Sequence, residues 1–185
     1  MGQTLIDHIY GINSSSLLYM TGMKKRIFLT AIVYIIFNTA YSQADSFDVF
    51  YFQQPPFFIK SEFPSRVEFS LTNKDGSFCN ITLYKSNPSK EDTLITIIQQ
   101  WNDQVVKRLT KADKQPAKTM TGQSIDGWAS SLAIGNFYQQ EKKAIVMLNS
   151  FKREKISACV VFTCSDKSFK LPIDEFSKNL RLIKQ

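Results

Sequence analysis

The stretch over residues 78–109 constrains the fold more than any other part of the chain. It predicts a strand, FCNITLYK, then the turn SNPS, and then a helix over KEDTLITIIQQWNDQVVKRL. Apolar residues recur in this helix at i, i+3, i+4 and i+7, which places them on one face. The residues on that face are Leu94, Ile97, Ile98, Trp101, Val105 and Leu109. Since the rest of the chain is mostly β-patterned, the sequence predicts a helix packed on a sheet.

Alternating apolar residues predict strands on both sides of this helix. Residues 66–71 and 78–85 flank the turn Asn73-Lys74-Asp75-Gly76, and together they predict a β-hairpin. A first strand is expected before Pro55-Pro56, because neither proline can donate to a ladder. That first strand is residues 47–52. The other expected strands are residues 118–125, 128–138, 143–151 and 156–163, the last three as an antiparallel meander.

Capping residues mark the starts of two helices. Ser89 is the expected N-cap of the first helix, and Ser165 or Asp166 that of a closing helix with Pro172 near its start. The closing helix has a narrow apolar face, made by Ile173, Phe176, Leu180 and Ile183. The predicted order is βββ-α-ββββ-α. We therefore expect an α+β fold, an antiparallel sheet of about six to seven strands with two helices packed on it.

An N-terminal leader precedes this domain. Met23-Lys24-Lys25-Arg26 is a basic start, residues 27–37 are continuously apolar, and Ala40-Tyr41-Ser42 offers small residues to a signal peptidase. This pattern predicts a signal peptide over residues 23–42, cleaved between Ser42 and Gln43, and a periplasmic or secreted protein. The alternative is a membrane anchor through residues 24–40, although its apolar run is shorter than the roughly 20 residues that span a bilayer.

Residues 1–22 come before the basic start of the leader. A signal peptide normally begins near its basic residues, so we interpret residues 1–22 as a mis-called N-terminal extension, with translation starting at Met23. Whether translation starts at Met1 or Met23 stays open at this point. The remaining residues, 43–185, are expected to form a single α+β domain, which is long enough to bury a hydrophobic core.

The basic residues are scattered along the chain, which carries a net charge of +7. Scattered lysines are typical of a solvated surface, whereas nucleic-acid binding needs a basic patch or stripe. We therefore expect an unidentified protein or envelope component as the partner, no nucleic acid, and no stable membrane insertion after the signal peptide is removed.

Three cysteines, Cys79, Cys159 and Cys164, lie in predicted strands. Cys159 and Cys164 are five residues apart in one extended run, so their side chains point to opposite faces, roughly 16 Å apart. That separation excludes a bridge between them. Cys79 is free to pair with Cys159 or Cys164 in an oxidising compartment. The alternative is that all three are buried thiols, because cysteine is also a good core residue.

The chain resembles an uncharacterised family of exported bacterial domains, whose fold is similar to that of PsbP and Mog1. A closing helix with Phe176, Leu180 and Leu182 matches this family, and four further features carry the resemblance. They are Pro55-Pro56 after an aromatic strand, FCNITLY before a Pro-Ser loop, Trp101 inside the helix, and Asp126-Gly127-Trp128 before a small-residue strand. The resemblance covers about residues 47–183. PsbP and Mog1 are accessory or binding proteins, so the resemblance implies a non-catalytic role.

The residues available for chemistry are few. The one histidine, His8, precedes the leader, which excludes Ser-His-Asp and Cys-His arrangements and histidine-based metal sites in the domain. The cysteines lack metal-ligand spacing, and no Gly-rich phosphate loop is present. We therefore expect no catalytic residues, no metal and no cofactor. Carboxylate chemistry stays open through Glu91, Asp92, Asp103, Asp126, Asp174 and Glu175.

Three functions are compatible with this sequence. The first is an exported, non-catalytic accessory or binding protein of the cell envelope. The alternative is a small-ligand carrier with an aromatic-lined pocket, and the second alternative is a carboxylate-dependent hydrolase. As a candidate ligand or partner surface we select Phe57, Phe58, Asp126 and Trp128, since Trp128 follows a turn and the two phenylalanines follow the prolines.

Overall fold

The computed structural model of the protein describes residues 44–183. The predicted signal peptide and its cleavage site between Ser42 and Gln43 lie outside these residues. Among the helices within residues 44–183, none is long and apolar enough to cross a membrane.

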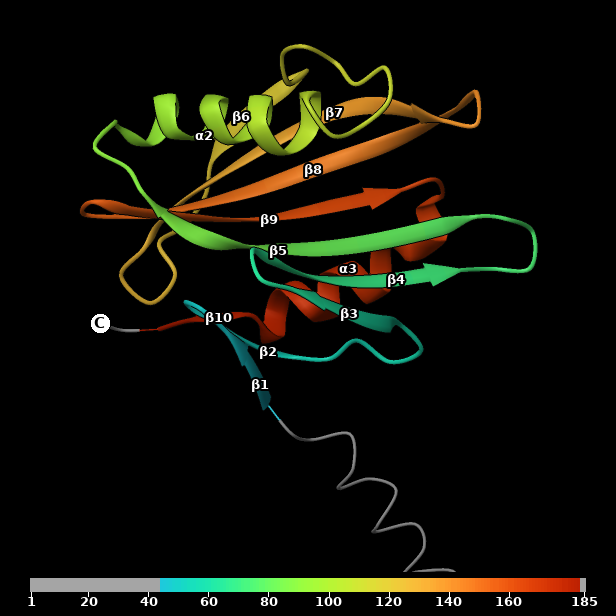
Figure 1. Cartoon of the computed structure of the whole chain (residues 1–185), viewed down its shortest axis with the longest axis horizontal. Helices are drawn as coiled ribbons and strands as arrows, with labels where there is room; N and C mark the ends of the chain where they lie inside the picture. Colours follow the sequence, from blue (N-terminus) through green and yellow to red (C-terminus); the bar gives the residue numbers. More distant parts are fainter. Residues whose placement is uncertain (1–43, 184–185) are drawn as a thin grey trace, which may run out of the picture. The chain divides into compact units, whose positions relative to one another are not determined.

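Within residues 44–183 the fold is α+β, with two antiparallel sheets and two α-helices; Figure 1 shows their arrangement. The larger sheet has the strand order β3-β4-β5-β9-β8-β7-β6. Its strands are β3 (Ile59–Phe63), β4 (Arg66–Thr72), β5 (Phe78–Pro88), β6 (Lys118–Thr121), β7 (Ala129–Gln139), β8 (Lys142–Arg153) and β9 (Ile156–Cys164). The smaller sheet, in the order β1-β2-β10, consists of β1 (Ala44–Phe47), β2 (Phe50–Gln53) and β10 (Arg181–Leu182).

The two helices lie on opposite faces of the larger sheet (Figure 1). Helix α2 (Thr93–Trp101) continues as a π-helix, η1 (Asn102–Val106), and packs over β7 and β8. Helix α3 (Lys170–Asn179) follows a 3₁₀ turn, η2 (Lys167–Phe169), and covers the other face together with the smaller sheet. Each face therefore has its own apolar core, because alternate residues of each strand point to opposite faces.

The larger core lies between the sheet and α3. Phe176 of α3 contacts the rings of Phe52, Phe69 and Phe162, with ring centroids 5.8–6.2 Å apart. The smaller core lies under α2, where the indole of Trp101 is buried and donates from Nε1 to the carbonyl of Asp113 at 2.9 Å. Strand β9 lies between β5 and β8 and is buried on both faces, as its doubly apolar sequence predicts.

The structure confirms the helix, the hairpin and the meander. Strands β4 and β5 pair around the turn at Gly76, which has a φ of +80°. Strands β7, β8 and β9 are consecutive antiparallel neighbours, as expected for residues 128–163. On α2 and η1, the predicted apolar face is buried at Ile97, Trp101 and Val105. Leu94 is the exception, since it is 63% exposed.

Three expectations at the ends of elements were wrong. The N-cap of α2 is Asp92, whose carboxylate accepts from the amide of Ile95 at 2.8 Å, whereas the hydroxyl of Ser89 contacts that of Thr96. Ile183 is not on the closing helix, because its amide donates to the carbonyl of Val49. Asp166 caps the 3₁₀ turn η2 and not the closing helix, because the N-cap of α3 is Phe169, which makes no side-chain capping bond.

The expected first strand over residues 47–52 is two strands, β1 and β2, joined by a tight turn. Asp48 takes a φ of +54° in this turn, and its carboxylate accepts from the amide of Ser86 at 2.6 Å. That long-range contact stabilises the turn. Pairing of β2 with β10 then completes a second sheet that the sequence pattern did not indicate.

Candidate functional site

A polar pocket of about 460 Å³ lies beside the carboxyl end of η1, on the sheet face that also carries α2. Helix α2 covers β7 and β8, so the same face of β4, β5 and β9 forms the floor of the pocket. The lining residues are Arg66, Glu68, Ser70, Asn80, Thr82, Tyr84, Gln104, Arg108, Leu109, Val161 and Thr163. Most of these side chains carry hydrogen-bonding groups, which is the opposite of the aromatic lining predicted for a ligand pocket.

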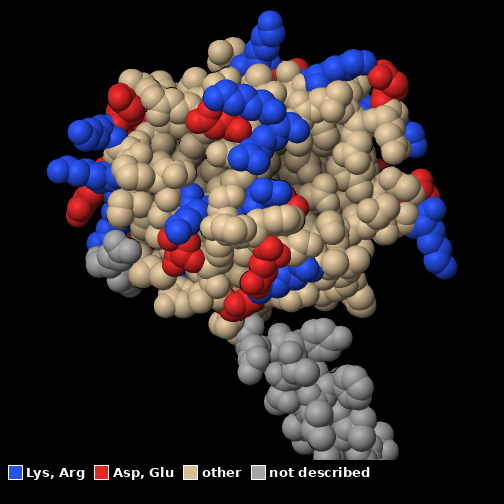
Figure 2. Space-filling view, in the orientation of Figure 1, with Lys and Arg blue, Asp and Glu red and all other residues tan. Residues whose placement is uncertain are grey.

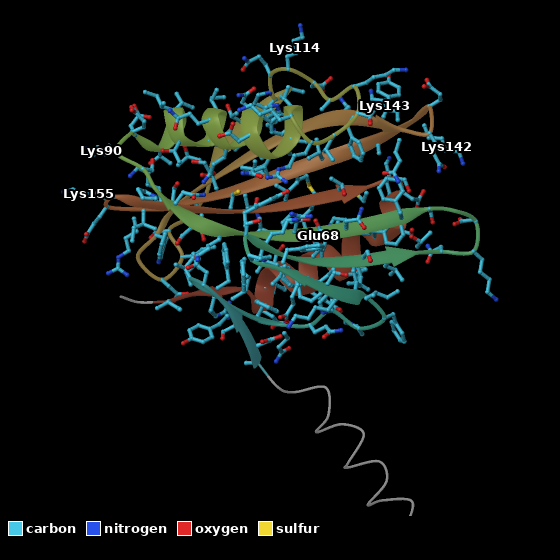
Figure 3. The ribbon with its side chains drawn as sticks, in the orientation of Figure 1. Glu68, Lys90, Lys114, Lys142, Lys143 and Lys155 are labelled. Carbon is cyan, nitrogen blue, oxygen red and sulfur yellow. The ribbon has the colours of Figure 1, made fainter. Side chains whose placement is uncertain are left out.

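Strand alternation explains why the floor is polar. In β4, Val67 and Phe69 point into the core under α3, which leaves Arg66 and Glu68 on the pocket side. In β5, Ile81 also points into that core, so that Asn80 and Thr82 face the pocket. Figure 3 shows Glu68 near the middle of the view, whereas the lysines that it labels lie at the periphery.

The π-helix η1 forms the wall of the pocket. In it the amide of Lys107 donates to the carbonyl of Asn102 at 3.1 Å, an i→i+5 bond. This wider turn keeps Val105 buried on the sheet while Gln104 and Arg108 border the pocket. π-Helical turns are rare and frequently occur at functional sites.

Gln104 carries an unpartnered polar atom at this wall. Its Oε1 is buried and has no hydrogen-bond partner in the described part of the chain. A buried acceptor without a partner costs about 1–3 kcal/mol. Because Gln104 is also a lining residue of the pocket, its amide is a candidate partner for a ligand.

The two arginines of the pocket differ in their surroundings. The Nε of Arg66 lies 2.5 Å from a carboxylate oxygen of Glu68, so this pair is neutral overall. The guanidinium of Arg108 lies over the ring of Tyr84, 5.3 Å from its centroid, and forms no ion pair within residues 44–183. Arg108 is therefore the one lining cation whose charge is not balanced by a carboxylate in contact.

Tyr84 stays uncharged at the base of the pocket. Burial raises the pKa of its phenol to about 12, although the positive charge of Arg108 opposes that shift. Across the floor, Asn80 Nδ2 lies 3.4 Å from Thr163 Oγ1, the residue opposite it in the β5–β9 register. The pocket thus combines one unbalanced cation with neutral donors and acceptors.

The four residues predicted to form a ligand or partner surface lie in different environments. Trp128 is 1% exposed, and its Nε1 donates to the carbonyl of Ile183 at 3.2 Å. Phe58 is also buried, whereas Phe57 is 88% exposed. Asp126 accepts from the amide of Leu182 at 3.1 Å. Trp128 and Phe58 therefore belong to the core under α3, and none of the four lines the polar pocket.

A second, shallower groove of about 330 Å³ lies between α2 and strand β6. Its apolar lining residues are Leu94, Ile97, Met120 and Ala129, and the others are glycine, serine and threonine. All four residues of β6 are exposed, because β6 is an edge strand of the larger sheet. Unlike the first pocket, this groove holds no charged side chain.

On the face shown in Figure 2, charges do not gather by sign. Figure 2 shows Lys and Arg interspersed with Asp and Glu on the face in view. Within residues 44–183, no three Cys, Asp or Glu side chains form a group that could hold a metal ion. The three cysteines are buried free thiols.

The sequence analysis missed the polar pocket, although a signal was present. The hairpin alternates strictly, and the residues opposite its apolar face are polar in both strands, at Arg66, Glu68, Asn80 and Thr82. The same sheet face has to receive an apolar helix. A polar half and an apolar half on one face indicate that the helix covers only part of it.

No protein-family model matches the chain, and no curated protein matches it. Solved structures with a similar arrangement include LpqN of Mycobacterium tuberculosis, which is involved in cell envelope biogenesis. The sequence identity is 7%, the match covers 72% of this chain and 82% of LpqN, and the TM-score is 0.49. A Pseudomonas aeruginosa protein of unknown function, PA94, has 12% identity, coverages of 74% and 82%, and a TM-score of 0.39. A Bacteroides thetaiotaomicron protein has 16% identity, coverages of 74% and 46%, and a TM-score of 0.45. The resemblance to PsbP and Mog1 stays a prediction.

Proposed function

We propose that the protein is an exported, non-catalytic binding protein of the cell envelope, and that the polar pocket binds a small hydroxylated anion such as a sugar acid. The buried, unpartnered Oε1 of Gln104 in the wall of a 460 Å³ pocket carries the proposal. Small-molecule sites typically enclose about 300–1,000 Å³, so this volume suits a monosaccharide-sized ligand.

The charge of the lining favours an anion. Arg108 contributes a guanidinium without a carboxylate partner, and Arg66 already neutralises Glu68. Arginine binds carboxylates through a planar set of donors, often in bidentate geometry. A carboxylate ligand would thus balance the remaining positive charge of the pocket.

The neutral lining groups favour hydroxyls on the ligand. Ser70, Thr82 and Thr163 offer groups that both donate and accept, and Asn80 offers an amide. Gln104 Oε1 accepts only, so it would take its hydrogen bond from a ligand hydroxyl. An apolar ligand would leave these groups unpaired, which disfavours the aromatic-lined carrier of the sequence-based alternative.

Binding is also favoured over hydrolysis. Paired-acid hydrolysis needs two carboxyl groups across a cleft, and the pocket lining includes one carboxylate, Glu68. That carboxylate is already engaged by the Arg66 guanidinium and has no second acid facing it across the pocket.

Calorimetric titration with glucuronate and glucose tests this proposal, because the two sugars share most of their hydroxyls and differ in the carboxylate. We expect glucuronate to bind at least tenfold more tightly than glucose. Arg108→Gln should abolish that preference, whereas Lys107→Gln, next to it in the turn after η1 but outside the pocket lining, should keep it. Equal affinity for the two sugars, or an Arg108→Gln variant that keeps the preference, would contradict the proposal.

A protein partner at the edge strand β6 is the second candidate function. It is favoured by the exposed β6 backbone beside the apolar groove at Leu94 and Met120. An exposed sheet edge can accept an added strand from another chain. Chemical cross-linking in envelope extract tests it, with Met120→Lys expected to remove the cross-linked product. A product that persists unchanged in that variant would argue against this edge.

A further inference from the structure

Cys79 on β5 and Cys164 on β9 lie directly opposite each other in the antiparallel register. The next two residues along the ladder are Phe78 and Ser165, and the amide of Ser165 donates to the carbonyl of Phe78 at 3.0 Å. Hydrogen-bonded and non-hydrogen-bonded pairs alternate along an antiparallel ladder, so the cysteines form a non-hydrogen-bonded pair. The Cα atoms of such a pair lie about 4.5 Å apart. A disulfide spans about 4.4–6.8 Å between Cα atoms, so the two backbones already have a bridging separation.

The two thiols also share one face of the sheet. Cys79 is 0% exposed and Cys164 is 7% exposed, and both belong to the core under α3. Cys159 belongs to the other core, under α2, where it lies opposite Tyr84 in the β5 register. The sheet therefore separates Cys159 from both other cysteines and selects one pairing from the two that the sequence allowed.

We propose that Cys79 and Cys164 form a cross-strand disulfide when the chain folds in an oxidising compartment, and that Cys159 stays a thiol. This inference is independent of the ligand proposed for the pocket. The co-reactant is a disulfide-bearing oxidant, either a small molecule or an oxidoreductase.

The reaction is two successive thiol–disulfide exchanges. One cysteine thiolate attacks the oxidant disulfide, which forms a mixed disulfide and releases one thiolate of the oxidant. The second cysteine then attacks the protein sulfur of the mixed disulfide and releases the other thiolate. The two cysteines lose two electrons and two protons, and the oxidant disulfide is reduced to two thiols.

The timing of the reaction follows from burial. Burial raises the pKa of Cys79 to about 12, with a further increase from the nearby Cys164, and burial also raises the pKa of Cys164. Thiolates are the reactive species in exchange, so the folded, reduced protein reacts slowly. The bridge therefore forms while β5 and β9 pair, before α3 closes the core.

The bridge would also fix the floor of the polar pocket. The next pair along the ladder is Asn80 and Thr163, whose side chains line the pocket. A covalent link beside that pair restrains the separation of β5 and β9 at this position. The core thiols and the pocket lie on opposite faces of the same two strands, so the bridge does not enter the ligand space.

Counting thiols after refolding tests the proposal. The full chain is unfolded with reductant, refolded with oxidised and reduced glutathione or with reductant alone, and then alkylated in denaturant for intact-mass measurement. We expect one alkylated cysteine after oxidative refolding and three after reductive refolding, with a peptide map that links residues 79 and 164. Three alkylated cysteines after oxidative refolding, a bridge that includes Cys159, or glutathione adducts in place of a bridge would overturn the proposal.

Matched variants sharpen the test. Cys159→Ala should form the same bridge and show no alkylation after oxidative refolding. Cys164→Ser should show two alkylated cysteines under both conditions. Because alkylation is done in denaturant, these counts do not depend on how stable each variant is. The bridged wild-type chain should also melt at a higher temperature than its reduced form, and an equal or lower melting temperature would count against a bridge in the native register.

Discussion

Replacing Gly135 with alanine tests how α2 is held on the sheet. Gly135 lies on β7 beneath the indole of Trp101, and an alanine Cβ would lie 2.7 Å from Cη2 and 2.8 Å from Cζ2 of that ring. Carbon atoms pack best at about 3.5–4.0 Å, so the ring would have to move by roughly 0.8 Å or more. Movement is restricted, because Trp101 is 1% exposed and its Nε1 donates to Asp113.

The magnitude follows from three terms. An added methyl group in a packed core costs about 1–3 kcal/mol. Displacing the indole hydrogen bond adds about 0.5–1.5 kcal/mol. Since Gly135 is outside the positive-φ region, alanine also gains about 0.4–1 kcal/mol by restricting the unfolded chain. The free energy of unfolding should therefore fall by about 2 kcal/mol, and the melting temperature by roughly 6 °C.

Urea unfolding followed by circular dichroism measures this change, and a double-mutant cycle with Trp101→Leu shows its origin. In the Trp101→Leu background the clash is removed, so Gly135→Ala should be neutral or slightly stabilising. The coupling between the two positions should be about 2 kcal/mol. If Gly135→Ala leaves the wild-type chain equally or more stable, or costs the same in both backgrounds, the packing of Trp101 on Gly135 is refuted.

Three further predictions concern capping and pH. Asp92→Ala should lower the free energy of unfolding, measured by urea titration, by about 1 kcal/mol, because it removes the N-cap of α2. Asp103→Ala, which removes a carboxylate outside the cap, should have a much smaller effect in the same titration. A hydrogen bond from Lys60 lowers the pKa of Asp45. The ionised carboxylate therefore stabilises the fold above pH 3.8, and this stabilisation is lost as the pH falls through the lowered pKa. In the Asp45→Asn variant, the free energy of unfolding should depend less on pH in this acidic range. Burial raises the pKa of Tyr84 to about 12, so stability should fall as the pH rises from about 10 towards 12, and a phenolate that titrates near 10 in the folded protein would contradict this.

The sequence predicted those parts of the fold that depend on local periodicity. The apolar period over residues 97–105 placed Ile97, Trp101 and Val105 on the sheet, and strict alternation in residues 66–85 gave the hairpin with its apolar face. Both patterns repeat within a few residues. Their outcome depends little on the rest of the chain, because a helix or strand with one apolar face has to bury that face.

Features that depend on long-range contacts could not be predicted in this way. The turn at Asp48 interrupts an aromatic run, and its carboxylate contacts the amide of Ser86, which is distant in sequence. Trp128 is buried in the core under α3, and its indole N–H donates to the carbonyl of Ile183, which is distant in sequence. No local pattern around either residue indicates these partners.

The candidate site lies between these two cases. Alternation predicts that Asn80 and Thr82 share a face, and the helix period predicts that Gln104 lies away from the buried stripe. Their meeting depends on how far α2 reaches across the sheet and on the π-helical turn at Asn102–Val106. That turn changes the angular position of every later helical residue, and a regular 3.6-residue period does not anticipate it.

The most direct test of the account is to map a bound anion onto the protein by amide chemical shifts in ¹H–¹⁵N spectra during titration with glucuronate. We predict saturable shift changes centred on Asn80, Thr82, Gln104 and Arg108, with little change at Phe57 and Met120. The same titration with glucose should give much smaller changes. Saturable changes that centre on another part of the surface, or equal changes with both sugars, would contradict the proposal that the polar pocket is the binding site.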